Sequence, residues 1–323
     1  MKMVPVIDGL QINSWDRKTF EELREGNVIA VRVACCVWES AGDALRELSK
    51  WNRFFAANSD IIIRGRSVAD IEFAEANNLT AIIQGFQNIC PIENDIDLFE
   101  IYHQLGIRVV QLMYNWQNVA GSGWAERSDA GLSRFGRHVI SVLNELGILI
   151  DLSHCGDQTA QEAIDSSNAP VSMTHANPRS FLDSRRNKPD SLLKQLAAAG
   201  GVLGMSLYPN HIRNGTDCTL PEFCDAVARS VDLMGIDHVA IGSDLVLNWP
   251  DRYLVELRYG PGGLSSEKDE LKGNMWPEWP KWFSRSSDFP NLMAGLRTSG
   301  FGANEIDHIM WRNWKNLLSK VIG

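Results

Sequence analysis

Short apolar runs alternate with amphipathic stretches along the whole chain. The amphipathic stretches have the pattern of helices, and several of them end at a glycine, as helices commonly do. Continuous apolar strands that alternate with helices indicate a parallel sheet covered by helices on its faces. The runs that we interpret as strands cover residues 4–10, 28–36, 61–64, 79–86, 107–114, 148–154, 170–175, 201–207 and 238–245.

The number of these runs favours a closed barrel. They are one more than an eight-stranded barrel uses, and residues 61–64 form the shortest and most polar-flanked run, so we expect them to be a peripheral strand. An open, doubly wound sheet is the alternative, but the chain has no glycine-rich dinucleotide motif and no P-loop. We therefore predict one α/β domain over residues 1–323, a (β/α)8 TIM-type barrel with a C-terminal helical and aromatic extension.

Composition narrows the class of protein. The net charge of −9 and the pI near 5.3 argue against nucleic acid or an anionic membrane as a partner. No run approaches the roughly 18 apolar residues of a membrane span, and the N-terminal residues lack the apolar core of a signal peptide. The six cysteines include no CxxC pair, which is typical of reduced thiols. We expect a cytoplasmic protein that acts on a small molecule.

Polar residues stand at the carboxyl ends of most of the predicted strands. Because TIM-type barrels place their active sites at the carboxyl ends of the strands, this is where we expect chemistry. Read in chain order, these ends carry Asp8, Gln84, Tyr114 with Asn115, His154, His175 and Asp244.

His154 and His175 end successive strands. Neighbouring strands lie about 4.8 Å apart, so the two imidazoles can share one metal ion. Asp244 ends the last strand, where its carboxylate can move a proton or complete a metal site, and a helix N-cap is the alternative. We interpret the remaining histidines as structural: His103, His138, His211, His238 and His308.

Three further segments have less specific patterns. Arg185 and Arg186 lie before a predicted helix and are suited to binding a carboxylate, with a solvated surface patch as the alternative. In residues 126–133, spacing alone suggests a helix start with Asp129 as N-cap. The prolines around Trp276, Trp279 and Trp282 predict an extended aromatic loop that forms a lid, a subunit contact or a pocket wall.

Taken in order, the motifs IDG, ERSDAGLS, IDLSH, MTH, SRRN and AIGSD resemble those of the membrane (renal) dipeptidase family of zinc peptidases. The resemblance runs from about residue 6 to the C-terminus. It implies an amidohydrolase-type barrel in which two zinc ions share a bridging carboxylate and a hydroxide attacks the peptide bond of a dipeptide. It assigns His154 and His175 to the second zinc, Asp244 to acid–base chemistry, Arg186 to the substrate carboxylate, and Tyr114 to the position of a carbonyl-polarising histidine.

The chain departs from that family at the first zinc. The family motif Asp-Gly-His-x-Asp reads Asp-Gly-Leu-Gln-Ile over residues 8–12, and the bridging glutamate corresponds to Gln84. Neutral amides and aliphatic side chains bind zinc poorly. We therefore expect one zinc ion or none, with Gln84, Gln11 and Asn115 supplying hydrogen bonds in the other half of the site.

Three functions are compatible with these residues. The first is a mononuclear hydrolase of a dipeptide or small amide, such as an acyl amino acid, that carries a carboxylate. The second is metal-independent acid–base chemistry in the same pocket, and the third is an inactive family member that binds a small metabolite. Zinc analysis separates the first from the others, and a substrate screen with an Asp244→Asn control divides the other two. The resemblance is also compatible with a homodimer.

Overall fold

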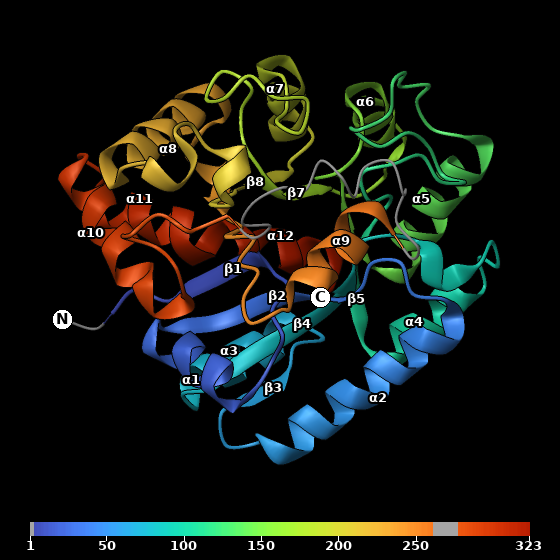
Figure 1. Cartoon of the computed structure of the whole chain (residues 1–323), viewed down its shortest axis with the longest axis horizontal. Coiled ribbons are helices and arrows are strands. Elements are labelled where there is room, and N and C mark those ends of the chain that lie inside the picture. The colour runs from blue at the N-terminus through green and yellow to red at the C-terminus, as the bar shows by residue number, and fades with distance from the viewer. Residues whose placement is uncertain (1–2, 261–276) are drawn as a thin grey trace.

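A computed structural model describes residues 3–260 and 277–323, and its centre is one parallel sheet that curls into a barrel (Figure 1). The strands pair in the order β1-β2-β4-β5-β6-β7-β8-β9, and β3 pairs only with β4. Their bounds are β1 Val6–Gln11, β2 Val28–Cys36, β3 Ile62–Arg64, β4 Thr80–Phe86, β5 Ile107–Gln111, β6 Leu149–Asp151, β7 Ser172–Ala176, β8 Val202–Met205 and β9 Val239–Ile241.

The barrel closes between the segments that follow its first and last strands. Ile12 N donates to the Leu245 carbonyl at 2.8 Å, and Asp244 N donates to the Leu10 carbonyl at 3.0 Å. The predicted eight-stranded α/β barrel is therefore confirmed, with β3 as the peripheral strand.

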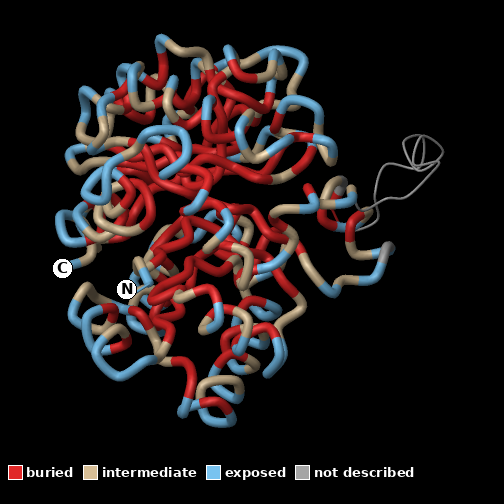
Figure 2. Tube along the Cα trace, turned by 90° about the vertical axis from the view of Figure 1, so that its left-hand side faces the viewer, coloured by how far each residue is buried: buried red, intermediate tan, exposed pale blue. Residues whose placement is uncertain are grey.

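Helices surround the barrel, so buried residues concentrate in its strands and exposed residues on its outer helices (Figure 2). The predicted helical extension at the C-terminus is present: Trp314 Nε1 donates to the Ile241 carbonyl at 2.8 Å and thereby attaches the last helix to β9. No helix among the described residues is long and apolar enough to cross a membrane. The helices are α1 Arg17–Glu25, α2 Ala41–Ala57, α3 Val68–Ala76, α4 Leu98–Leu105, α5 Arg134–Leu146, α6 Asp157–Ser166, α7 Asp190–Ala198, α8 Leu220–Met234, α9 Asp251–Tyr259, α10 Phe289–Thr298, α11 Ala303–Asp307 and α12 Asn313–Val321.

The Asp-Gly pair near the start of the chain serves packing. A Cβ atom on Gly9 would lie 2.5 Å from the Thr174 carbonyl oxygen and 2.7 Å from the Trp314 ring, so only glycine fits this close approach. The neighbouring Asp8 is fully buried and accepts a hydrogen bond from Ser243 N at 2.7 Å. Asp8 therefore ties β1 to the end of β9. The prediction that it closes a strand is wrong, because β1 continues past it.

Asp129 also differs from its predicted role. The helix that follows it, α5, is capped by Ser133, whose side chain accepts from Gly136 N. Asp129 instead accepts hydrogen bonds from Gln158 N at 2.7 Å and Thr159 Oγ1 at 2.7 Å, at the start of α6. It stabilises the next helix along the chain because the loop after β5 folds back across that helix end.

Candidate active site

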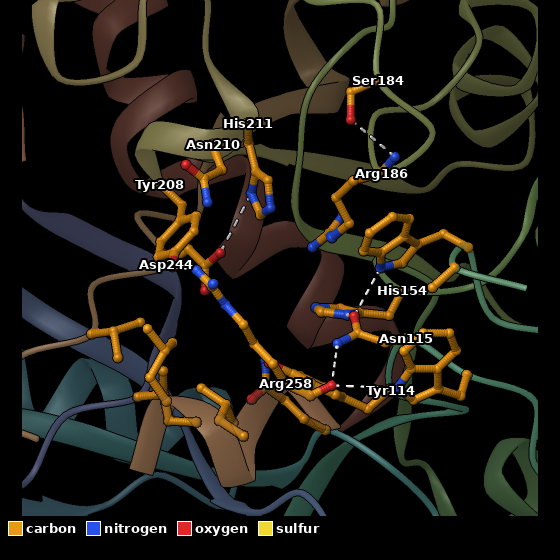
Figure 3. A pocket seen from close by; sticks show the side chains of 18 residues that line it. Tyr114, Asn115, His154, Ser184, Arg186, Tyr208, Asn210, His211, Asp244 and Arg258 are labelled. Atoms are coloured by element: carbon orange, nitrogen blue, oxygen red, sulfur yellow. Dashed lines mark hydrogen bonds and ion pairs between the residues drawn. The ribbon is translucent and has the colours of Figure 1, made fainter. Parts of the chain in front are cut away.

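A cavity of about 520 Å³ lies at the carboxyl ends of the strands. Segments that follow β1, β4, β5, β6, β7, β8 and β9 contribute to its wall, and α9 covers one side. Figure 3 shows its side chains, with Asp244, His211, Arg186 and His154 around the same space. The residues predicted from the strand ends thus lie together, with Gln84 and Asp8 as exceptions.

His154 lines the cavity and meets His175 directly behind it, with their Nε2 atoms 2.9 Å apart. His154 Nδ1 lies 2.8 Å from Asn115 Oδ1, and the same oxygen accepts a hydrogen bond from the Trp124 indole at 2.8 Å. Because Asn115 presents its oxygen here, His154 Nδ1 must be the donor. The neutral His154 ring then has a lone pair on Nε2.

The same assignment follows for His175. Its Nδ1 lies 2.8 Å from Thr174 Oγ1, whose single proton goes to the Asp151 carboxylate at 2.6 Å. His175 Nδ1 must therefore donate to Thr174, which leaves a lone pair on its Nε2 as well. Burial, followed by the Arg186 guanidinium, lowers the pKa of both histidines well below the usual range, so both rings are neutral. Two lone pairs facing one another are suited to one shared cation.

Tyr114 and Asn115 support this pair from the loop after β5. The Tyr114 ring stacks on His154 with a centroid distance of 4.4 Å, and the Trp38 ring packs edge-on against Tyr114. Asn115 has a φ of 59°, in the left-handed region that asparagine tolerates better than most residues. This turn lets its amide reach both His154 and the carbonyl of Arg258 on α9.

Arg186 is fixed behind the histidines. Its guanidinium donates to the Ser153 carbonyl at 2.8 Å and to the His175 carbonyl at 2.8 Å. Only 3% of the residue is exposed, yet it lines the cavity, and its buried Nε has no partner among the described residues. The side chain is therefore held in place with hydrogen-bonding capacity left for an anion.

Asp244 and His211 form a second polar pair. Asp244 Oδ2 lies 3.6 Å from His211 Nδ1. Burial raises the pKa of the Asp244 carboxyl to about 8, although the Arg186 guanidinium opposes this shift. Burial also lowers the pKa of His211 well below the usual range. Near neutral pH this pair is an uncharged acid beside a neutral imidazole.

His211 was interpreted from the sequence as structural, and the structure instead places it in the wall of the cavity. It comes from a short 3₁₀ helix, Pro209–His211, that follows β8. Its nearness to the end of a predicted strand was the only sequence signal that could have identified it. The spacing of apolar residues predicts strands and helices, but it does not predict the direction of side chains in a short loop.

Gln84 requires a correction. Its amide lies 3.6 Å from Cys35 Sγ, and it does not line the cavity. Gln87 lines it instead, with Nε2 at 3.4 Å from His175 Nε2. The reason is the two-residue period of a strand: Ile83 packs in an inner cluster of the sheet, so Gln84 points to the opposite face. The neutral amide beside the histidines is that of Gln87.

The half of the site opposite the histidines is apolar. Ile12 lines the cavity there with Val246, Leu254 and Leu257. Gln11, predicted to hydrogen-bond in this half, instead donates to Asp8 Oδ2 at 2.8 Å and does not line the cavity. This part of the cavity wall therefore offers aliphatic side chains to a ligand.

His154 and His175 could hold one metal ion between them. No three His, Cys, Asp or Glu side chains come together as a metal site in the part of the chain that the structure describes. Two imidazole lone pairs face one point, but Gln87 brings no negative charge. Arg32, also buried, adds a permanent positive charge that contributes to lowering the pKa of His175, after burial and Arg186.

The tryptophan-rich segment is placed in part. Trp276 lies outside the described residues. Trp282 Nε1 donates to the Cys218 carbonyl at 2.8 Å. The Trp279 ring packs edge-on against Tyr208, a residue of the cavity wall, at 5.9 Å. This segment therefore packs over the barrel and braces the wall from outside.

The fold and the cavity together define a class: a (β/α)8 barrel whose pocket, at the carboxyl ends of the strands, combines paired imidazoles, a carboxyl group and a buried guanidinium. A family model described as membrane dipeptidase (peptidase family M19) matches residues 13–248, well over half of the chain. The protein belongs to the membrane dipeptidase family.

Solved structures and curated relatives agree with this placement. An amidohydrolase from Pseudomonas aeruginosa aligns with a TM-score of 0.92 and 33% identity over 99% of this chain and 97% of its own. A metallopeptidase from Rhodobacter sphaeroides, solved with a phosphinate mimic of the dipeptide L-Ala-D-Ala, shares the fold with a TM-score of 0.83 and 19% identity, over 99% and 100% of the two chains.

Among the curated relatives, a Schizosaccharomyces pombe protein named as an uncharacterized dipeptidase is 31% identical over 52% of this chain and 42% of its own length. A dipeptidase from Claviceps purpurea is 23% identical over 87% of this chain and 60% of its own length. The chain thus spans about half the length of the curated relatives it matches.

Proposed function

We propose that the protein hydrolyses the amide bond of a dipeptide or small acyl amino acid that carries a free carboxylate, in a site that holds at most one zinc ion. One observation supports this most: Arg186, Asp244 and His154 face a single cavity at the carboxyl ends of the strands. Family membership supports the reaction class, because relatives are named as dipeptidases.

Each of these residues has a proposed role. Arg186 binds the substrate carboxylate, because a fixed guanidinium with free N–H groups suits a planar anion. Asp244 handles the proton: with a pKa of about 8 it is protonated at neutral pH and can donate to the leaving amine. Tyr114 donates a hydrogen bond to the scissile carbonyl, and Asn115 orients His154.

His154 and His175 are the proposed ligands of the single zinc ion. Bound there, zinc would acidify a water molecule and polarise the substrate carbonyl. Catalytic zinc usually has three protein ligands, so an ion with two imidazole ligands would be held weakly. This is why we propose one ion at most.

Two alternatives have their own supporting observations. The apolar wall around Ile12 and the neutral Gln87 favour a family member that binds a small metabolite without hydrolysing it. The Asp244–His211 pair favours acid–base chemistry without metal. A cytoplasmic location is a further proposal, which the six free cysteines support, and a homodimer remains a prediction.

A dipeptide screen tests the proposed function. Protein supplied with zinc should release free amino acids, and Asp244→Asn should lower kcat/KM by roughly 10²-fold or more, in the range of a lost general acid. Arg186→Gln should raise KM, while the exposed neighbour Arg185→Gln should behave as wild type. Absence of hydrolysis across dipeptides and acyl amino acids would refute the proposal and favour the binding alternative.

A further inference from the structure

Arg258 is a second cation of the cavity wall, at the end of α9. The backbone that bears it is anchored from two sides. Trp38 Nε1 donates to the Leu257 carbonyl at 2.9 Å, and Trp116 Nε1 donates to the Arg258 carbonyl at 3.3 Å. Asn115 Nδ2 donates to the same carbonyl at 3.4 Å. The last turn of α9 is therefore held against the barrel, and the side chain starts from a fixed point.

Among the described residues, the Arg258 guanidinium has a neutral partner. Its Nη2 donates to Tyr208 Oη at 3.2 Å, and Tyr208 is braced by the Trp279 ring. Arg258 forms no ion pair with a carboxylate within residues 3–260 and 277–323. Other arginines, such as Arg137 and Arg179, do pair with acidic side chains. The charge of Arg258 is thus left to face the cavity.

The charges of the cavity wall do not balance. Arg186 and Arg258 enter the cavity from different elements, and Figure 3 shows both side chains directed into it. Asp244 is the acidic residue among those that line it, and burial keeps it protonated up to a pKa of about 8. The wall therefore has two guanidinium groups and one carboxyl group, although the whole chain has a net charge of −9.

We infer that the ligand of this cavity carries two carboxylates, one bound by Arg186 and the other by Arg258. The inference rests on the proposed function in one respect: Arg186 takes the carboxylate next to the scissile amide. Arg258 then takes a second carboxylate, at the end of an acidic side chain. The substrate class is therefore an acidic dipeptide or an acyl derivative of an acidic amino acid, whose methylene groups contact the apolar wall formed by Val246, Leu254 and their neighbours.

Binding of glutarate, compared with its monoamide, tests this inference without requiring turnover. The two molecules have the same length, and only the dicarboxylate presents a negative charge to both guanidiniums. Calorimetry at pH 7 should show glutarate bound roughly tenfold or more tightly, as expected for a charge-assisted hydrogen bond. Arg258→Gln should reduce this preference to about threefold or less, and Arg258→Lys should retain part of it, because lysine keeps the charge.

Arg252→Gln is the matched control, because Arg252 lies on the same helix but is exposed and does not line the cavity. It should keep the wild-type preference. Equal binding of the two molecules by the wild type, no binding of either, or a preference that survives Arg258→Gln would each overturn the inference.

Hydrolysis of Ala-Glu and Ala-Gln separates this inference from the proposed function. A higher kcat/KM for Ala-Glu that Arg258→Gln abolishes supports both. Cleavage of the two dipeptides with equal kcat/KM supports the hydrolase and overturns the two-carboxylate ligand. If glutarate is preferred and no dipeptide or acyl amino acid is cleaved, the two-carboxylate site stands and the proposed hydrolysis fails.

Discussion

The chemistry of Asp244 is set by its surroundings. Its backbone has a φ of 59°, in a region that few residues other than glycine adopt. This turn directs the carboxyl group toward His211, where 7% of the residue remains exposed. Burial disfavours the ionised form, so the pKa rises to about 8. Asp244 is thus a weak acid in the folded protein and an ordinary carboxylate in the unfolded chain.

This difference predicts a pH-dependent stability between pH 6.5 and 8. The unfolded chain loses the Asp244 proton near pH 3.8, whereas the folded protein keeps it up to about pH 8. At Asp244 the folded state therefore binds one more proton in this window, and the contribution of this group to the free energy of unfolding falls as pH rises, by up to about 1.4 kcal/mol per pH unit. Asp244→Asn should remove this contribution.

Urea denaturation across that window measures it. The stability of Asp244→Asn relative to wild type should increase from pH 6.5 to pH 8. Asp225→Asn, at an exposed position on α8, should show the same pH dependence as wild type. A wild-type slope that the Asp244 substitution leaves unchanged would contradict the raised pKa.

Several site residues could be predicted because a parallel barrel gathers its strand ends at one rim. His154, Asp244, Arg186, Tyr114 and Asn115 line the cavity as the strand ends and the resemblance indicated, and His175 lies directly behind it.

Residues placed by side-chain direction could not be predicted in the same way. Gln84 was assigned from an approximate strand end, and an error of three positions turns a side chain to the other face. The roles of all these residues remain proposals.

At the scale of elements, the junction between β1 and β9 depends on Asp8. Its carboxylate accepts hydrogen bonds from Ser243 N and Ser243 Oγ, and from Gln11 Nε2 at 2.8 Å. All of these groups are buried, so none can turn to water if the carboxylate is removed. The apolar runs predicted the two strands. They did not predict this link, because the link joins residues far apart in the sequence.

Asp8→Ala should therefore lower the free energy of unfolding by about 2–4 kcal/mol, since it leaves several buried donors without an acceptor. Asp16→Ala is a useful comparison: Asp16 caps α1 through Thr19 N at 2.8 Å, and loss of an N-cap costs about 1 kcal/mol. Chemical denaturation of both variants at pH 7 gives the two values. Equal small losses would show that the buried network contributes little.

At the scale of the whole molecule, the pattern of the chain was sufficient to predict the barrel, its peripheral strand and its C-terminal helices. Strong apolar runs fix strand identity, and eight of them with intervening helices leave few topologies. The cover over the cavity was not predictable. α9 lies in a segment with no strand pattern, and its position depends on Trp38 and Trp116, which are distant in sequence.

Metal content is a property of the whole protein that follows from the site. Wild-type protein dialysed against zinc should contain one ion per chain or fewer. Gln87→Glu places a carboxylate beside His175 and should raise zinc affinity roughly tenfold or more, because it supplies a third ligand. Gln84→Glu introduces the same charge beside Cys35, away from the histidines. It should leave zinc affinity unchanged while lowering the free energy of unfolding.

Competition with a chromophoric chelator measures the affinities, and elemental analysis measures the stoichiometry. Two tightly bound zinc ions per wild-type chain would refute the single-ion site. Equal effects of the two glutamate substitutions would contradict the placement of Gln87 beside the histidines.

Asn115 connects the cover of the cavity to its floor. The oxygen of its amide holds His154, and the nitrogen holds the carbonyl at the end of α9. If α9 swings outward to admit a molecule, Asn115 loses its hydrogen bond to α9 and keeps the contacts of its amide oxygen with His154 and Trp124. A ligand that displaces the last turn of α9 would therefore also disturb the amide that orients His154.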